Sequence, residues 1–492
     1  MIEQLPIINL ILLLTTALAI PLFKKRSINT TTILGFVVLV LVLISSIILL
    51  NHVNVNGPFV YRFGNYSNVF GIEFLINSCS AFFTLFIVAL VLIIFVYSTG
   101  DATEGVAKKE YGRYYILLFI LIFSLFGIIY TNDLFNTYVF MEISAITTCS
   151  IISIKRKKEN YTAAFRYVIL NEVGSLSYLF GVALLYMITG YTNIDLVSQS
   201  LQTVSNLYQA NIMTAIGFMV VGIGIKAAIF PFHVWLPDAH STAPSSSSAI
   251  LSAIVIKAYI LVLVKVLFRV FGIDILDEFS IPLIITIIGA TGMIMGSVFA
   301  IAQKDVKRML GYSSVAQIGY IVLGLGLMSV LGMKAAFFHI ISHGLMKAAL
   351  FLTVGVVIFH RKIRNVDDFK GLGYQMPITM VVFSIAALGM IGIPITSGFI
   401  SKFNLGLAVL DSGQTIFIAV IILSGLLNAI YYLPIIISAF LKGKEPELSV
   451  VKIEKVPKAM IASIVILGIG ILFIGIFPNV LLNLIEMAVQ NF

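Results

Sequence analysis

The sequence has few charged residues. Asp, Glu, Lys and Arg make up 11% of its 492 residues, whereas hydrophobic residues make up 60% and the mean hydropathy is +1.07. A soluble globular domain carries about 25% charged residues, so this chain cannot cover a water-facing surface. We expect a membrane protein, whose backbone must form helices or a closed barrel. Unbroken apolar runs at 82–96 and 461–477 favour helices, because barrel strands alternate apolar and polar residues.

Cysteine is nearly absent as well. Cys79 and Cys149 are the only two, and each lies within an apolar run far from the other. The chain has no Cys-x-x-Cys spacing, so it cannot by itself supply a zinc knuckle or the ligands of an iron–sulfur cluster. A structural disulfide has little support either. We expect no bound metal or cofactor, and we expect any redox chemistry to take place on another subunit.

The first apolar run also lacks a basic start. The residues before it include Glu3 and no Lys or Arg, whereas a cleavable signal peptide begins with positive charge. Lys24, Lys25 and Arg26 instead follow the run. We therefore predict that the first run is a retained helix.

What the chain does have is a series of apolar runs of the length that crosses a membrane, about twenty residues each. Fourteen occur, at residues 4–22, 33–51, 72–97, 113–130, 134–153, 163–189, 211–235, 247–271, 281–302, 309–330, 334–359, 376–405, 415–441 and 459–485. No Pro/Gly/Ser-rich linker divides them, so we expect a single membrane domain over 1–492, with N-terminal helices over 4–97.

The basic residues lie on one side of these runs. The connections 23–32, 98–112, 154–162, 303–308, 360–375 and 442–458, with Arg113 at one edge, hold 22 of the 31 Lys and Arg. Because cytoplasmic loops carry Lys and Arg, this distribution predicts a multi-pass protein of the cell membrane with its N-terminus outside. It also accounts for the net charge of +9 without nucleic acid, which needs a solvated basic face.

A second group of charged residues lies inside the apolar runs, where each costs about 3 kcal/mol or more and usually marks an ion path. We predict that Glu142 and Glu172 are buried acids. Three basic residues toward helix ends, Arg166, Lys265 and Arg269, are expected to extend to the membrane interface. The remaining basic residues are Lys226, Lys257, Lys347 and Lys402.

Two of these lysines lie beside proline. Lys226 precedes Pro231, and prolines break membrane helices where the backbone lines a cavity. The segment 389–403 again combines glycine, proline and a lysine, Lys402, but in reverse order. The reversal is typical of inverted repeats, which place broken helices at equivalent points of two halves. Two short segments leave the repeat undecided.

His339, His343 and Lys347 recur every four residues and so share one helix face. Histidine titrates near neutral pH, so a water-bridged row of these side chains can relay protons. Structural hydrogen bonding is one alternative, and a metal or haem site is another, although no Asp or Glu completes a ligand set. Glu142 and Lys226 can likewise form a static salt bridge. The predicted proton pathway comprises Glu142, Lys226, Lys257, His339, His343, Lys347 and Lys402, with His233, His240 and Glu172 as secondary candidates.

Five segments together resemble one known family. They are TNDLFNTYVFMEISAI (131–146), GIKAAIFPFHVWLPDAHSTAPSSSSA (224–249), QKDVKRMLGYSSVAQIGYI (303–321), FHIISHGLMKAALF (338–351) and GIPITSGFISKF (392–403). They are similar to the antiporter-like proton-translocating family, which includes large subunits of Mrp-type Na+/H+ antiporters, of membrane-bound hydrogenases and of respiratory complex I. The resemblance covers about residues 70–440.

The resemblance implies about fourteen helices in an all-α fold, with two inverted five-helix repeats over 113–271 and 281–441, discontinuous seventh and twelfth helices, and a last helix over 459–485. It also implies that Glu142 and Lys226 form the family's fifth- and seventh-helix pair and that Lys257 is its eighth-helix bridge. His339, His343 and Lys347 match the eleventh-helix relay. Lys402 matches the terminal site, where lysine is more similar to the D-type large subunit of Mrp antiporters, as is the lack of a long carboxy-terminal transverse helix.

We therefore predict a membrane subunit that translocates protons, with sodium as a second candidate ion, in an Mrp-type antiporter or a related complex such as a membrane-bound hydrogenase. Its expected partners are further antiporter-like and small helical subunits and the lipid bilayer. The alternative is a quinone-associated or antiporter-like subunit of NADH dehydrogenase (complex I). A quinone-reducing role would need a redox centre, for which the chain has no ligands. A solute symporter acting alone is a third possibility.

Overall fold

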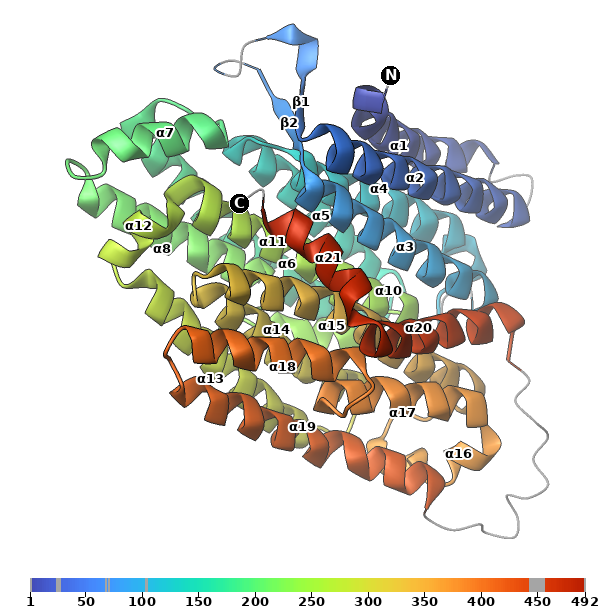
Figure 1. The fold of residues 1–492 in the computed structure, drawn as a ribbon. Coiled ribbons are helices and arrows are strands. Elements are labelled where there is room, and N and C mark those ends of the chain that lie inside the picture. The colour runs from blue at the N-terminus through green and yellow to red at the C-terminus, as the bar shows by residue number, and fades with distance from the viewer. Residues whose placement is uncertain are drawn as a thin grey trace.

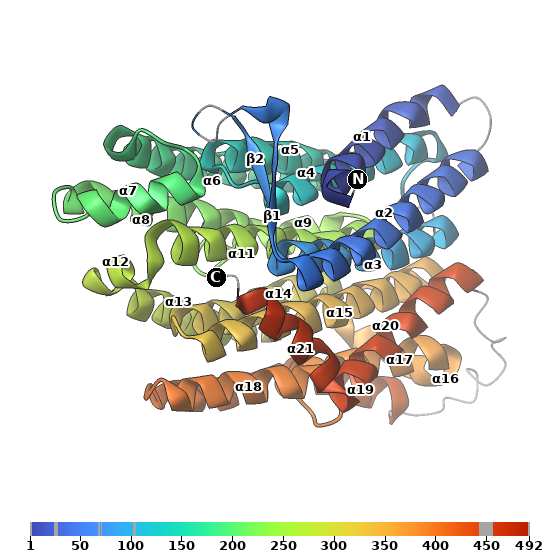
Figure 2. The same cartoon turned by 45° about the horizontal axis from the view of Figure 1, so that its top comes forward.

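Helices that run close to one common axis make up the protein (Figures 1 and 2). The structure, a computed structural model, describes residues 2–23, 28–66, 69, 71–101, 105–441 and 456–490. The first half contains α1 (Leu5–Phe23), α2 (Ile28–Asn56), α3 (Ser78–Asp101), α4 (Tyr111–Tyr130), α5 (Leu134–Ser153), α6 (Lys158–Thr189), α7 (Ile194–Val204), α8 (Gln209–Lys226), α9 (Trp235–Thr242), α10 (Ser245–Ile250), α11 (Ile256–Val264) and α12 (Gly272–Glu278). The second half contains α13 (Ile281–Ile301), α14 (Val306–Gly326), α15 (Val330–Arg361), α16 (Leu372–Gln375), α17 (Pro377–Ile391), α18 (Ser397–Asp411), α19 (Ile416–Phe440), α20 (Lys458–Ile476) and α21 (Pro478–Val489).

Thirteen helices among the described residues are long and apolar enough to cross a membrane. The remaining predicted span, 376–405, forms the two shorter helices α17 and α18, which are separated at residues 392–396. The seventh predicted span is divided in the same way, because α8 and α9 are separated at 227–234. The prediction of about fourteen spans with discontinuous seventh and twelfth helices is therefore confirmed. The inverted repeat and the domain assignment stay predictions.

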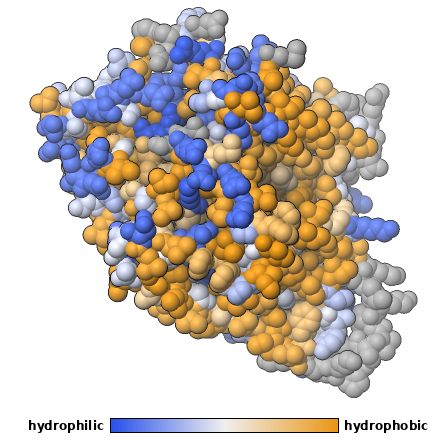
Figure 3. Space-filling model, in the orientation of Figure 1, coloured by the Kyte–Doolittle hydropathy of each residue, from blue (hydrophilic) through white to orange (hydrophobic). Residues whose placement is uncertain are grey.

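The outer surface suits a lipid environment. Large aliphatic side chains are exposed along the outer helices, among them Leu18 (66% exposed), Ile169 (49%) and Leu426 (62%). Figure 3 shows these apolar residues spreading over much of the surface, while hydrophilic residues gather toward the end of the bundle that carries α7. Such a large exposed apolar area marks a surface that contacts lipid or other subunits.

The helical fold also contains one short hairpin that the sequence did not predict. Strand β1 (Phe59–Arg62) pairs antiparallel with β2 (Glu73–Ile76), and this hairpin projects from the bundle (Figure 1). The sequence placed the start of a helix at residue 72. In the structure α3 begins at Ser78, because the side chain of Asn77 accepts a 2.9 Å hydrogen bond from the Ser80 amide and so caps the helix.

A buried carboxylate holds the hairpin to the bundle. Glu73 is 3% exposed, and it accepts 2.8 Å hydrogen bonds from the side-chain amides of Asn132 and Asn193. Its other oxygen lies 3.3 Å from Nε of Arg62 on the opposite strand. These contacts connect β2 to the α4–α5 turn and to the start of α7, a helix that the sequence analysis did not predict.

The last predicted helix, over 459–485, is also wrong in part. It is divided after Ile476 into α20 and α21, and Pro478 occupies the first turn of α21. Proline lacks an amide hydrogen, so it is accommodated in a first helical turn but not in a helix interior.

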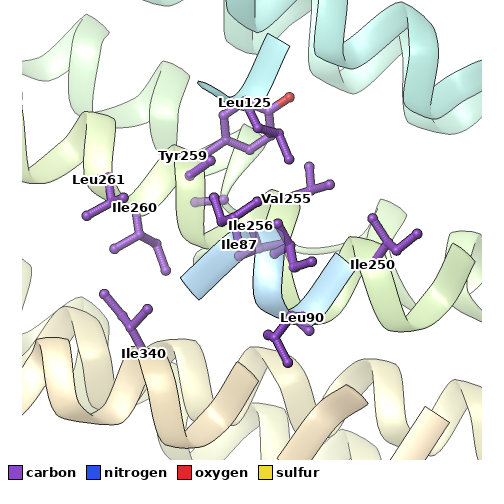
Figure 4. Packing of buried hydrophobic residues seen from close by; sticks show 14 of the residues in the cluster. Ile87, Leu90, Leu125, Ile250, Val255, Ile256, Tyr259, Ile260, Leu261 and Ile340 are labelled. Atoms are coloured by element: carbon purple, nitrogen blue, oxygen red, sulfur yellow. The ribbon is translucent and has the colours of Figure 1, made fainter. Parts of the chain in front are cut away.

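The helix that runs from α10 through α11 to α12 occupies the centre of the bundle. Every residue from 243 to 267 is buried. Figure 4 shows Val255, Ile256 and Ile260 surrounded by Ile87 and Leu90 of α3, Leu125 of α4 and Ile340 of α15. A lysine on this helix, Lys257, is therefore enclosed by protein on all sides.

Lys265 on the same central helix corrects another expectation. Instead of extending to the membrane interface, its Nζ donates to the carbonyl oxygens of Ile128 (3.0 Å), Ile129 (2.7 Å) and Thr131 (2.8 Å). These oxygens belong to the C-terminal end of α4, where helix carbonyls have no intrahelical partner and a cation is favourable. Arg269 is also mostly buried, 12% exposed, and pairs with Asp195 at 2.6 Å. Arg166 is exposed, as expected, and pairs with Asp238.

We expect Lys265→Met to lower the free energy of unfolding by about 2 kcal/mol, because it leaves three buried carbonyl oxygens without their donor. Thermal unfolding of the purified protein in detergent measures the change. As a control, Lys334→Met removes an exposed ion pair with Glu486 and should change stability by less than about 1 kcal/mol. Equal effects of the two substitutions would contradict a capping role for Lys265.

Candidate functional site

The predicted acid–base pair is formed. Nζ of Lys226 lies 3.3 Å from Oε1 of Glu142, and Lys226 is completely buried. Lys226 is the last residue of α8, where the helix dipole favours a positive charge. Glu142, on α5, also accepts a hydrogen bond from the hydroxyl of Ser175 on α6. Its side chain is 16% exposed, so the prediction of a fully buried acid is wrong.

Close packing of α6 and α8 brings these groups together. A β-carbon added at Gly222 would lie 2.5 Å from the carbonyl oxygen of Gly174, closer than any real side chain is found. Any residue larger than glycine at position 222 would keep the two backbones farther apart. The end of α8 is thereby held against the helix that carries Ser175.

Glu172 is also less buried than predicted. It lies on α6 within electrostatic range of Glu142 and Lys226, and it is only partly covered by the chain. Around it, Ile169 and Val173 are exposed by 49% and 50%. Carboxyl groups are costly on a lipid-facing surface, so this α5–α6 face has the character of a contact with another membrane subunit.

One aromatic side chain stands between the pair and the central helix. Nζ of Lys226 lies 5.6 Å from the ring centroid of Tyr259, which is a favourable cation–π position. The Tyr259 hydroxyl shares a hydrogen bond with Ser144 of α5. Tyr259 lies on α11, the helix that also carries Lys257, so the pair packs against the central helix.

Lys257 is held by an irregular turn of its own helix. Its Nζ donates to the carbonyl oxygen of Ser252, five residues earlier, within the π-helical turn Leu251–Val255. Such turns leave carbonyl groups outside the usual helical pattern and are frequent at functional sites. The Ser252 hydroxyl shares a 2.9 Å hydrogen bond with Ser314 of α14.

Lys347, on α15, also donates hydrogen bonds to main-chain and hydroxyl oxygens. Its Nζ donates to the carbonyl oxygen of Leu310 at 2.8 Å and to the hydroxyl of Ser313 at 3.0 Å. Ser313 is in turn 2.8 Å from the hydroxyl of Tyr432 on α19. Lys257 and Lys347 lie within electrostatic range of each other.

The two predicted histidines stack along α15. The ring centroids of His339 and His343 are 6.0 Å apart, and His339 also stacks on Tyr320 with ring centroids 5.3 Å apart. Nδ1 of His339 is 2.9 Å from the hydroxyl of Ser401. No group of three His, Cys, Asp or Glu capable of holding a metal occurs among the described residues.

Lys402 lies at the second helix break. Its Nζ donates to the carbonyl oxygens of Met390 (2.7 Å) and Ile391 (3.0 Å), which end α17. The same atom is 4.7 Å from the ring centroid of Tyr320. Because α17 stops at the break over 392–396, its last carbonyl oxygens are free to hold Lys402. Tyr320 contacts both Lys402 and His339.

The secondary candidates differ from one another. His240 lies among the charges of Lys257, Lys307 and Lys347, and neither of its ring nitrogens has a hydrogen-bond partner in the described part of the chain. His233 instead packs between Phe230 and Phe299, with ring centroids at 5.4 and 5.8 Å. We call the predicted proton pathway from Glu142 to Lys402 the row. Of the two histidines, His240 lies beside the row and His233 does not.

Sequence reasoning missed Lys307. It was counted among the basic residues of the connection 303–308, but it is 1% exposed and donates to the carbonyl oxygen of Ala243 at 2.5 Å. The sequence holds no signal that separates it from its neighbours Lys304 and Arg308, because only packing against α9 buries it. Gln317 on α14 was also missed; both atoms of its amide are buried without a partner among the described residues.

Comparison with known proteins shows which family the chain belongs to. Residues 131–428 match the family described as "NADH:quinone oxidoreductase/Mrp antiporter, TM". The chain belongs to this family. The match spans α5 to α19 and includes every residue of the predicted row. The protein is accordingly a multi-pass membrane protein.

Relatives within the NADH:quinone oxidoreductase/Mrp antiporter family come from more than one kind of complex. The chain is 36% identical to NADH-quinone oxidoreductase subunit N of Desulforudis audaxviator, over 99% of each chain. It is 32% identical to the D subunit of the Na(+)/H(+) antiporter of Alkalihalophilus pseudofirmus, over 85% of this chain and 83% of the relative. A chain of the membrane-bound sulfane sulfur reductase, an archaeal respiratory membrane complex, superposes with a TM-score of 0.90 at 26% identity and covers 99% of this chain and 97% of that one.

Several polar atoms along the row are buried and have no hydrogen-bond partner among the described residues. Their surroundings imply ordered water. These atoms include Nε2 of His339, both ring nitrogens of His343 and the amide of Gln317. Because such atoms are costly to leave unpaired, we expect a high-resolution map of the complex to show water within hydrogen-bonding distance of His343 and Gln317. A dry, tightly packed surrounding of both side chains would contradict the prediction.

Proposed function

We propose that this protein moves protons across the membrane as one subunit of a multisubunit complex, by way of Glu142, Lys226, Lys257, His343, His339, Lys347 and Lys402. The single observation that supports this best is that buried ionisable side chains extend from the Glu142–Lys226 pair to Lys402, with aromatic contacts at both ends and groups within electrostatic range of one another in the middle. A static salt bridge would account for the first pair alone. It would not explain why the other three lysines of the row, Lys257, Lys347 and Lys402, are buried.

The pair is suited to act as an electrostatic trigger. At 3.3 Å and an effective dielectric constant of 20, the attraction between Glu142 and Lys226 is about 5 kcal/mol. Protonation of Glu142 removes that attraction, and the ammonium of Lys226 becomes correspondingly less stable in its buried site. Its proton is then driven toward the next acceptor, past Tyr259 toward Lys257.

Beyond Lys257 the neighbouring groups are mutually repelling cations. His343 lies within electrostatic range of Lys257, Lys347 and His339. A proton that arrives on one of these groups destabilises a proton on the next. Repulsion therefore passes a proton along the row until it reaches the amine of Lys402, whose ammonium form donates hydrogen bonds to carbonyl oxygens at the end of α17.

We propose that protons enter the middle of the row from the end of the bundle that carries the basic connections. A cavity of about 690 Å3 lies there and is lined in part by Ser241, Thr242 and Arg308. Ser241 and Thr242 follow His240 directly, and Ala243 holds Lys307. His240 and Lys307 thus lie between this cavity and Lys347. Basic connections are typical of the cytoplasmic side, so we infer that this end is cytoplasmic and that the N-terminus lies outside.

The partner subunits are inferred to contact the α5–α6 face. Glu172 and Glu142 are accessible there, amid exposed aliphatic side chains. A neighbouring subunit would cover these carboxyl groups and could change their charge during its own reaction. This contact gives the complex a route by which chemistry elsewhere acts on the pair.

We expect Glu142→Gln and Lys226→Ala each to reduce coupled proton movement by about tenfold or more, because either change removes the trigger. Proton uptake into inverted membrane vesicles containing the assembled complex measures the effect, and co-purification of the partners checks assembly. The control is Glu486→Gln, which neutralises an exposed acid on α21 and should leave transport unchanged. Wild-type transport in both test variants would refute the assignment.

A second candidate is a role in an NADH-oxidising complex rather than in an Mrp-type antiporter. The 36% identity to the NADH-quinone oxidoreductase relative over nearly the whole chain favours it, whereas lysine at position 402 and the Na(+)/H(+) antiporter relative favour the antiporter. Deleting the gene distinguishes the two. Loss of Na+-driven proton movement alone supports the antiporter, and loss of NADH-driven proton movement alone supports the second candidate.

A further inference from the structure

Two adjoining cavities lie where α4 begins, at the end of the bundle that carries the basic connections. The first has a volume of about 670 Å3 and lies between α4 and the adjacent ends of α1 and α2, with Ile20 and Lys108 among its lining residues. The second has about 430 Å3 and lies between α4, α5 and α6. Glu110, Arg113 and Ile116 line both. Neither cavity belongs to the row described above.

The shared wall is built around one buried carboxylate. Glu110 is 4% exposed, and its two oxygens lie 2.7 Å from Arg113 and 3.1 Å from Arg156. Both guanidinium groups are about half exposed, 53% and 51%, so each keeps donors directed away from Glu110. Lys108 and Lys109 are exposed at the first cavity. Among the described lining residues, four cations therefore face a single acid.

The backbone at Arg156 supports a specific role for this side chain. Arg156 has a φ of 56°, a left-handed conformation that is unfavourable for a non-glycine residue. The turn between α5 and α6 keeps arginine in this conformation, and so directs its side chain to Glu110 and the second cavity. Strain of this kind tends to occur at ligand-binding positions.

Both cavities lie at the level of lipid headgroups. The span that contains α4 begins at Lys108, so its first residues lie at one edge of the hydrocarbon region. Tyr111 lines the first cavity and Tyr161, 53% exposed, lines the second. Tyrosine is enriched at this interface. Below the charged rim the walls are apolar, with Ile20, Ile116 and Leu117.

We propose that these cavities hold the headgroup of an anionic phospholipid, with its phosphate between Arg113 and the neighbouring cations and its acyl chains along the apolar walls. Arginine forms paired hydrogen bonds with phosphate, and basic pockets on the cytoplasmic side are suited to anionic lipids. A zwitterionic lipid would bring its own cation against four others. Free phosphate would leave the apolar walls uncovered.

Native mass spectrometry and thermal unfolding of the delipidated, full-length protein test this proposal. The probes are phosphatidylglycerol, phosphatidylcholine and inorganic phosphate, each added to the detergent-solubilised chain. We expect phosphatidylglycerol to bind and to raise the unfolding midpoint, with little effect from the other two. In K108Q/K109Q its apparent affinity should fall about tenfold, because two surface cations are lost.

The matched control is K158Q/K304Q, which removes the same charge from exposed lysines that line neither cavity. It should keep wild-type affinity. Arg156→Gly is a second test variant: glycine accepts the left-handed backbone, so the turn is preserved while the cation is lost, and lipid affinity should fall. Equal affinity in test and control variants would overturn the proposal. Equal stabilisation by phosphatidylcholine, or by inorganic phosphate alone, would overturn it as well.

Discussion

An ammonium group inside a membrane must be surrounded by oxygen atoms, because hydrocarbon cannot replace the water it loses. In this protein the main chain provides most of them. Six lysines are buried among the described residues; one, Lys226, pairs with a carboxylate, and the other five donate to carbonyl oxygens. A neutral carbonyl stabilises a proton on lysine without the strong attraction of a carboxylate. In the proposed function, this difference lets the proton leave again.

Helix ends and irregular turns are the source of most of those carbonyl oxygens. A regular helix uses nearly all of its carbonyl groups internally. Here α17 ends at residue 391 and exposes oxygens to Lys402, a π-helical turn exposes one to Lys257, and the end of α9 exposes one to Lys307. The breaks in the seventh and twelfth helices and the π turn of the central helix are therefore part of the site. A bundle without these breaks would offer fewer carbonyl oxygens to buried charges.

The middle of the row and its Glu142 end have different surroundings. Lys257, His343 and Lys347 are enclosed by the central helix and its neighbours, whereas Glu142 and Glu172 are accessible from the α5–α6 face. This asymmetry fits a protein whose ion path is internal but whose trigger is exposed to a neighbour. It also agrees with relatives that belong to multisubunit complexes. The cationic cavities at the start of α4 lie apart from both and face the headgroup level of the lipid.

The sequence by itself determined the membrane character, the approximate number of spans and the two helix breaks, and it predicted the residues of the row. Each follows from local chemistry: apolar runs have a required length, proline cannot continue a helix, and a charge in an apolar run is costly. Only the tertiary structure decided how the other charges inside the bundle are placed. Lys265 caps α4, Lys307 is buried although it lies in a basic connection, and Glu172 is partly exposed on an outer face. These three outcomes depend on contacts between helices distant in sequence, and no local pattern carries that information.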